Sequence, residues 1–223
     1  MTGRIMKRMK HNRFDFTNHF PERMRLGAIR LYGLLVLDIQ KLEHHIQERV
    51  AQIRSEYETK KPEGYFSSRK LYREFGIDPT RYRPSSEALW RRVRKERMFT
   101  RRHPLVDLTN LLALEYQISF GLYDLDKIRG SIVAGAGTFA DRYQSLGRGM
   151  IHLEGKIVLS DQRGPFGNPS SDSMRTCIDH RSRNILQVLF FHRDYLGPKQ
   201  LLNETVQRFS GFFSFSDAKK GLY

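Results

Sequence analysis

The sequence predicts an α+β protein, because one part of the chain has the period of a helix and another has the pattern of strands. Between Leu35 and Tyr57, apolar residues recur every three or four positions, as on the buried face of an amphipathic helix. After Gly130, short apolar runs alternate with glycines, which is typical of strands joined by turns. With 39% hydrophobic residues among 223, the chain can also bury a core and fold on its own.

The chain begins with a basic segment. Residues 1–13 predict a flexible arm, because they carry several Arg and Lys residues and no apolar core follows them. The run LGAIRLYGLLV at 26–36 predicts a strand, in which Gly27 and Gly33 favour a bulge. The apolar stripe of the long helix has these members: Leu35, Ile39, Leu42, Ile46, Val50, Ile53 and Tyr57. Its spacing is close to a heptad, so pairing of two chains through this helix stays open beside packing on a sheet.

Turn-forming residues follow the long helix. From 65 to 84 the sequence predicts a structured loop, since Pro79 and Pro84 disfavour a regular helix. Ser85 or Ser86 is then expected to cap a short helix whose surface is mostly basic.

The second half of the chain alternates helices and strands. Residues 105–117 keep the helical period. The runs at 150–153 and 156–159 are joined by Glu-Gly and predict a hairpin. Residues 183–191 predict a well-buried strand, and 198–209 predict a last short helix.

An excess of positive charge is the strongest feature of the composition. The chain has 39 Lys and Arg against 24 Asp and Glu, a formal net charge of +15. Such a surplus attracts polyanions, so nucleic acid is the first partner to consider, although a membrane surface would attract the same charge. No apolar run reaches the roughly 18 residues needed to span a bilayer, and a cytoplasmic protein is expected. Cys177 is the only cysteine, which excludes an intramolecular disulfide and a multi-cysteine zinc site.

The well-characterised catalytic motifs give no lead, because the sequence has no Walker loop, dinucleotide-binding fingerprint, HExxH or GxSxG. Two segments remain as candidates. The basic helix could pair its Arg side chains with successive phosphates. The loop at 161–176 combines turn formers with hydroxyl, carboxylate and Arg side chains, a composition that often carries function. Each also has a structural reading, as a solvated helix face and as a surface loop held by its own hydrogen bonds.

Three segments, taken in order, resemble the B3/B4 editing domain of bacterial phenylalanyl-tRNA synthetase β chains. They are RYRPSSEALWRRV at 81–93, HPLVDLTNLLALEY at 103–116 and LYDLDKIRGSI at 122–132. The stretch FGIDPTRYRPSSEAL at 75–89 and the loop GPFGNPSSDSMRT at 164–176 resemble free-standing B3/B4 proteins still more closely. The likeness extends from about residue 20 to about residue 195.

The resemblance implies an α+β fold with mixed or antiparallel sheets flanked by helices. It implies a B3/B4-like tRNA-binding domain over residues 14–200, followed by a C-terminal helix and tail over 201–223. In the synthetase, a pocket of this domain receives the end of a mischarged tRNA and hydrolyses the wrongly attached amino acid. Bound water and RNA groups do much of that chemistry, so neither a metal nor another cofactor is expected. The partner implied is tRNA with an aminoacylated 3′ end, bound by a monomer or a homodimer.

The resemblance, the basic helix and the loop at 161–176 together give residues their expected roles. Those expected to order the ester and a water are Asn110, Ser173, Arg175 and Thr176. Those expected to bind the substrate are Thr109, Gly121, Tyr123, Asp124, Asp161, Asp172 and Gln187. Those expected to bind RNA are Arg81, Arg83, Arg91, Arg92, Arg94, Lys95 and Arg97.

Two departures from the synthetase pattern bear on activity. Gly121 stands where the synthetase has a His, and Gln187 aligns with a pocket Glu that reads the tyrosine hydroxyl. Gln187 can accept a hydrogen bond but cannot act as a base, and Gly121 has no side chain. Two functions therefore stand beside each other: an editing hydrolase that acts in trans on mischarged tRNA, and a non-catalytic RNA-binding protein with the same fold. A third, weaker reading is a pocket for a small amino-acid-like ligand.

Asp124 and Asp126 also have a structural reading. Acids beside Lys127 and Arg129 can fix a turn through salt bridges and backbone hydrogen bonds.

Overall fold

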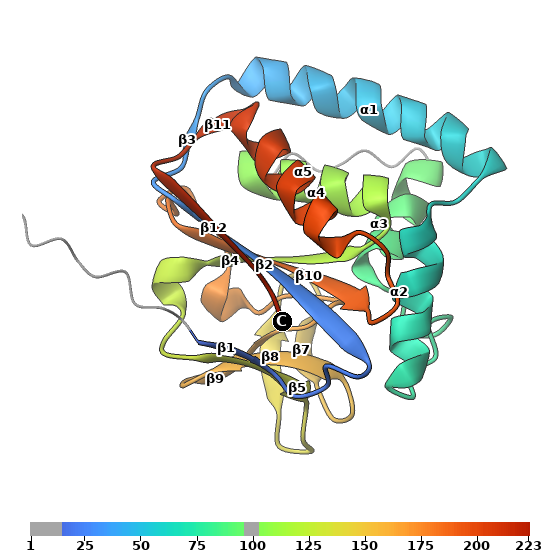
Figure 1. The fold of residues 1–223 in the computed structure, drawn as a ribbon, viewed down its shortest axis with the longest axis vertical. Helices are drawn as coiled ribbons and strands as arrows, with labels where there is room; N and C mark the ends of the chain where they lie inside the picture. The colour runs from blue at the N-terminus through green and yellow to red at the C-terminus, as the bar shows by residue number, and fades with distance from the viewer. Residues whose placement is uncertain (1–14, 96–102) are drawn as a thin grey trace, which may run out of the picture.

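The computed structural model describes residues 15–95 and 103–223, and these form three layers. Helices cover one face of a central four-stranded sheet, and a second four-stranded sheet packs against its other face (Figure 1). The predicted α+β class, with mixed and antiparallel sheets flanked by helices, is therefore confirmed. Within these residues no helix is long and apolar enough to cross a membrane.

The α-helices of the described residues are α1 (Ile39–Thr59), α2 (Glu63–Glu74), α3 (Ser85–Arg94), α4 (Pro104–Tyr116) and α5 (Pro198–Ser210). The short 3-10 helices are η1 (Leu125–Lys127) and η2 (Met174–Thr176).

The central sheet has the order β12-β2-β10-β4 and is antiparallel throughout. Its strands are β2 (Met24–Tyr32), β4 (Ser119–Asp124), β10 (Ile185–His192) and β12 (Asp217–Leu222). The second sheet has the order β1-β5-β8-β9, in which β1 runs parallel to β5. Its strands are β1 (Phe16–Asn18), β5 (Ile132–Ala136), β8 (Ile157–Asp161) and β9 (Gly164–Gly167). Two smaller sheets pair β3 (Leu35–Val36) with β11 (Phe213–Ser214) and β6 (Arg142–Ser145) with β7 (Gly149–His152).

Strand β10 divides the core into two parts. All its residues are buried, which confirms the predicted buried strand. Ile185 and Leu189 belong to the cluster beneath the helices, whereas Leu186 and Val188 belong to the cluster between the two sheets. This alternation follows from the period of two in a strand that is covered on both faces.

The long helix is confirmed, but it begins later than its apolar stripe. The stripe residues that are buried are Leu42, Ile46, Ile53 and Tyr57. Leu35 lies in β3 and is 56% exposed, and Ile39 is 51% exposed. The Asp38 side chain starts the helix, because it accepts a hydrogen bond of 2.9 Å from the Lys41 amide.

The loop predicted at 65–84 is wrong in its first part, where α2 forms. The prolines that disfavour a helix stand only after Gly76, and Leu71 and Tyr72 give α2 a buried side. The helices predicted at 105–117 and 198–209 are confirmed as α4 and α5. The basic helix is confirmed as α3, but neither Ser85 nor Ser86 caps it, because the helix starts after Pro84 without a side-chain cap.

The predicted hairpin at 150–159 is also wrong. Strand β7 pairs with β6, and β8 pairs with β5 and β9, so the two runs belong to different sheets. The residues that follow β5 pack between the runs at 150–153 and 156–159. The Gly137 amide donates to the Lys156 carbonyl at 2.8 Å, and the Gly155 amide donates to the Gly137 carbonyl at 2.9 Å.

Residues 201–223 pack against the preceding part of the chain. Strand β12 pairs with β2 along the edge of the central sheet, although its sequence has no strong period. The basic arm at 1–13 and Arg97 lie outside the described residues.

Candidate nucleic-acid interface

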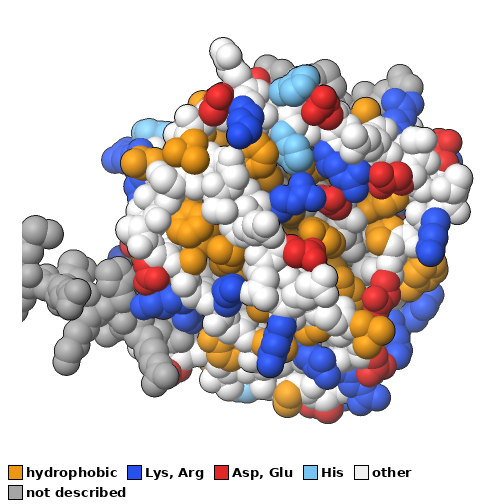
Figure 2. All heavy atoms as spheres, turned by 45° about the horizontal axis from the view of Figure 1, so that its top comes forward, with side chains coloured by type: hydrophobic (Ala, Val, Ile, Leu, Met, Phe, Trp, Pro, Cys, Tyr) orange, Lys and Arg blue, Asp and Glu red, His pale blue; other side chains and the backbone are white. Residues whose placement is uncertain are grey.

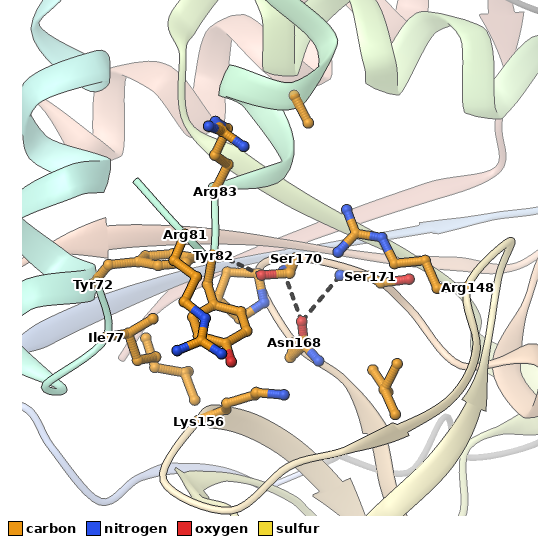
Figure 3. A pocket seen from close by; sticks show the side chains of 14 residues that line it. Tyr72, Ile77, Arg81, Tyr82, Arg83, Arg148, Lys156, Asn168, Ser170 and Ser171 are labelled. Carbon is orange, nitrogen blue, oxygen red and sulfur yellow. Dashed lines mark hydrogen bonds between the residues drawn. The ribbon is translucent and has the colours of Figure 1, made fainter. Parts of the chain in front are cut away.

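A cavity of about 380 Å³ opens between three segments of the described chain. They are the connection from α2 to α3, the β6–β7 sheet with the turn after it, and the loop at 168–171 (Figure 3). Tyr72 reaches the cavity from α2. The volume of the cavity lies at the low end of the range for small-ligand pockets.

The cavity is lined by positive side chains. They come from different segments: Arg81, Arg83, Arg148 and Lys156. None of the described lining residues is Asp, Glu or His. Burial of the ammonium group, and then the positive charge of Arg148, lower the pKa of Lys156. The cavity therefore favours an anionic ligand.

Tyr82 presents an aromatic ring at this cavity. It is 45% exposed, and its ring lies close to two cations. The Arg81 guanidinium lies 5.3 Å from the ring centroid, and the Lys156 ammonium lies 5.6 Å from it. Figure 3 shows these three side chains gathered at one side of the pocket. A ring beside two cations can bind a nucleic-acid base and its phosphate together.

Asn168 shapes the polar wall of the cavity. Its Oδ1 accepts hydrogen bonds from the amides of Ser170, at 2.7 Å, and Ser171, at 3.0 Å. Its Nδ2 donates to the Tyr143 hydroxyl at 2.8 Å, and that hydroxyl donates to the Ser171 carbonyl at 2.6 Å. The hydroxyls of Ser170 and Tyr72 are 2.7 Å apart. The loop is therefore held by buried partners, while its hydroxyls reach the pocket (Figure 3).

Next to this loop, Tyr123 and Asp172 form a buried pair. The Tyr123 hydroxyl donates to Asp172 Oδ1 at 2.6 Å, and the Leu122 amide donates to Oδ2 at 3.2 Å. Burial raises the pKa of the Asp172 carboxyl to about 7, although both hydrogen bonds lower it. A Cβ atom on Gly121 would lie 2.1 Å from the Tyr123 hydroxyl oxygen. Gly121 therefore makes room for the Tyr123 ring, and a His there would collide with it.

Asp161 and Arg175 pair in a second place. The Arg175 guanidinium donates to both Asp161 carboxylate oxygens, at 3.0 and 2.9 Å, and to the Gly164 carbonyl at 3.1 Å. Asp161 also accepts from the amides of Arg129 and Arg163, each at 2.8 Å. Burial raises the pKa of Asp161, but these hydrogen bonds and the Arg175 charge outweigh it and lower the pKa. This arrangement ties the β8–β9 turn to η2.

Thr109 and Gln187 meet in a third place, beneath the helices. Gln187 is fully buried, and its Nε2 donates to the Thr109 hydroxyl at 2.9 Å. Asn110, the next residue on α4, is partly exposed. Neither Thr109, Asn110 nor Gln187 lines the cavity described above.

Asp124 starts η1, as the structural reading of this acid suggests. Its Oδ1 accepts from the Asp126 amide at 3.0 Å, and its Oδ2 accepts from the Ser182 hydroxyl at 2.6 Å. Ser173 precedes η2 and Thr176 ends it, and both are buried beside Phe166, whose carbonyl accepts from the Ser173 amide at 3.0 Å. The residues expected to form one site thus lie in several separate places.

The basic side chains of α3 lie on the surface. The exposed ones are Arg91, Arg92 and Arg94, and Lys95, directly after the helix, is exposed as well. Trp90 and Val93 bury the other side of this helix in the core beneath the helices. Arg83 lines the cavity and also lies 3.8 Å from the Glu87 carboxylate. By contrast, the face covered by α1 and α5 mixes acidic and basic side chains (Figure 2).

Several pocket residues were missed by the sequence analysis. They are Tyr72, Tyr82, Arg148 and Lys156. Tyr82 stands inside the resembling segment at 75–89, so the segment itself was a usable signal. Lys156 stands in a turn that reads as an ordinary hairpin, and only the tertiary fold brings it to the pocket.

One comparison with known proteins shows the family of this chain. The model of the B3/4 domain family matches residues 67–197, which is more than half of the chain. This chain therefore belongs to the B3/4 domain family.

A crystal structure of an N-terminal fragment of the phenylalanyl-tRNA synthetase β-subunit from Pyrococcus horikoshii is similar to this chain, with 13% identity and a TM-score of 0.42. The match covers 93% of this chain and 49% of that one, so the chain spans about half the length of the synthetase fragment. No curated protein matches the sequence.

Proposed function

We propose that this chain is a cytoplasmic tRNA-binding protein, monomeric or homodimeric, whose basic pocket receives the aminoacylated 3′ end. One observation carries the proposal. The segments at 75–89 and 164–176, which resemble free-standing B3/B4 proteins, line the same cavity although they are far apart in the sequence. The first contributes Arg81 and Tyr82, and the second contributes Asn168 and Ser170.

The charges of the pocket suit the end of an RNA strand. Arg81, Arg148 and Lys156 can pair with phosphates, and the Tyr82 ring can stack on a base. The exposed cations of α3 extend the positive surface beyond the pocket. Membership of the B3/4 family supports tRNA rather than another polyanion as the partner.

We further propose that the bound ester is hydrolysed. Water adds to the ester carbonyl carbon, the acyl–oxygen bond breaks, and the products are a free amino acid and a tRNA with a terminal hydroxyl. The described lining residues offer no carboxylate or imidazole as a base. The water must then be oriented by the Ser170 and Ser171 hydroxyls and by the hydroxyl groups of the RNA itself.

The lack of an acid or His among the described lining residues favours a second function, which is RNA binding without hydrolysis. A pocket whose described lining lacks any acid or His can hold an RNA end without activating water. The two functions share the binding step and differ only in turnover.

A deacylation panel separates these functions. Each tRNA is charged with a cognate or near-cognate amino acid, and release of the amino acid is measured together with tRNA binding. Release of one wrong amino acid supports the hydrolase, and binding without release supports the RNA-binding protein. No binding of tRNA at moderate salt would contradict both, and would favour a small amino-acid-like ligand.

Variants of the pocket residues test whether tRNA binds in the pocket. Arg81→Ala and Lys156→Ala should each weaken binding and reduce the log-log salt slope by roughly 0.7 to 0.9 per lost phosphate contact. Lys199→Ala is the matched control, because Lys199 is an exposed cation of α5 that does not line the pocket. Equal losses in all three variants would point to nonspecific attraction by net charge.

A further inference from the structure

The exposed face of α2 carries an aromatic ring followed by two cations. Phe66 is 62% exposed, and Lys70 and Arg73 follow it four and seven residues later. Residues with this spacing lie on one face of a helix. The function proposed above makes no use of this face.

The C-terminal end of this helix borders the basic pocket. Tyr72 lies on the same helix, lines the pocket and meets the Ser170 hydroxyl at 2.7 Å (Figure 3). Ile77, just beyond the helix, also lines the pocket. Phe66 precedes Tyr72 by six residues, so it lies about 9 Å from it along the helix axis and about a third of a turn around it. A strand that leaves the pocket therefore passes over the C-terminal end of α2, where Arg73 is exposed, to reach Phe66.

The charges of this face are available to a ligand. Among the described residues, no ion pair involves Arg73, and its side chain is on the surface. Lys70 lies 2.6 Å from the Asp194 carboxylate, but both side chains are more than half exposed. An exposed ion pair of this kind contributes little and can exchange for a phosphate.

Tyr65 holds the Phe66 ring in place. The two rings meet edge to face, with centroids 5.3 Å apart. The Lys61 ammonium lies 4.3 Å from the centroid of the Tyr65 ring. An exposed ring fixed by a neighbour, with cations along its helix, is the combination that binds single strands by stacking and phosphate pairing.

We propose that the exposed face of α2 binds the unpaired RNA that immediately precedes the nucleotide in the pocket. A base stacks on Phe66, and its neighbouring phosphates pair with Lys70 and Arg73. This inference rests on the proposed function, because it takes the strand in the pocket to be the 3′ end of tRNA. An acidic peptide would match the two cations but would gain nothing specific from stacking on an aromatic ring.

The test compares two RNA hairpins with the same acceptor-stem duplex, one with the unpaired 3′ extension and one blunt-ended. Phe66→Ala should weaken binding of the extended hairpin about tenfold, because one stacked base is lost, and should leave the blunt hairpin unchanged. Phe66→Tyr should bind like the wild type. Lys70→Ala and Arg73→Ala should each reduce the salt slope for the extended hairpin by roughly 0.7.

Phe139→Ala is the matched control, because Phe139 is 85% exposed and has no part in the proposed track. The inference is overturned if Phe66→Ala binds the extended hairpin as tightly as Phe139→Ala does, or if it weakens both hairpins equally. The inference is also overturned if an acidic peptide competes with the extended hairpin for the wild-type protein and this competition is lost in Phe66→Ala. A wild-type protein that binds neither hairpin overturns the proposed function itself, whereas loss in the pocket variants without loss in Phe66→Ala overturns only this inference.

Discussion

The Tyr123 hydroxyl donates a hydrogen bond of 2.6 Å to the Asp172 carboxylate, and this contact joins β4 of the central sheet to the loop beside the basic pocket. Asp172 follows directly on Ser171, which lines the pocket. A second tyrosine, Tyr143, holds the Ser171 carbonyl at 2.6 Å. The pocket loop is thus anchored from beneath by two buried phenols.

Asp172 should make the stability of the protein depend on pH. Burial raises the pKa of its carboxyl from 3.8 to about 7 in the folded protein. The folded state then binds more protons than the unfolded state between about pH 4 and pH 7, so the free energy of unfolding should fall as pH rises through this window. Asp172→Asn should remove this part of the dependence. Urea denaturation of both proteins at several pH values checks it, and parallel curves for the two proteins would contradict it.

Gly121 should not tolerate a side chain. A Cβ atom there would lie 2.1 Å from the Tyr123 hydroxyl oxygen, so Gly121→Ala should cost about 1 to 3 kcal/mol of stability through overpacking. Gly135→Ala is the matched control, because Gly135 is also in a strand and its Cβ would meet nothing nearer than 3.7 Å. Thermal denaturation of the two variants should separate them. Equal midpoints would show that Tyr123 can move aside at little cost.

The sequence predicted the elements whose pattern is local. The stripe of α1, the helical period of α4 and the mostly apolar run of β10 each follow from the pattern of one element. Helix α2 was missed because prolines near its end dominated the interpretation of the whole stretch. Strand β7 pairs locally with β6, but β8 pairs with β5, and the residues after β5 pack between the two runs, which no local pattern encodes.

The candidate site was harder to predict for the same reason. Resemblance singled out the segments at 75–89 and 164–176, and residues of both segments line the pocket. Polar residues assigned one by one did not gather, because side chains such as Gln187 and Asp161 are buried with partners of their own. Sequence alone cannot tell a polar side chain that faces a ligand from one that holds two strands together.

Arg175 should be more important for stability than for chemistry. Its guanidinium donates to both oxygens of Asp161, whose side chain is fully buried. Arg175→Ala should therefore cost about 2 to 4 kcal/mol, because it leaves a buried carboxylate without its partner. Arg175→Lys should recover part of that loss, since a lysine keeps the charge but not the double hydrogen bond. Urea denaturation measures both. Normal stability with lost deacylation would instead assign Arg175 to the reacting groups.

Gln187→Glu tests whether the acid of the synthetase pattern can be accommodated at this position. Gln187 has no exposed surface, and its Nε2 donates to the Thr109 hydroxyl at 2.9 Å. A glutamate there would be buried without a cation among its described contacts, so burial should raise the pKa of the new carboxyl above that of a free Glu. The variant should then lose stability relative to the wild type as pH rises from about 5 to 8, because ionisation of the buried acid is costly. Thermal denaturation across that range measures the difference. Gln187→Met, which keeps the volume without the charge, should show no such slope. An equally flat difference for Gln187→Glu would mean that water or a cation reaches the position.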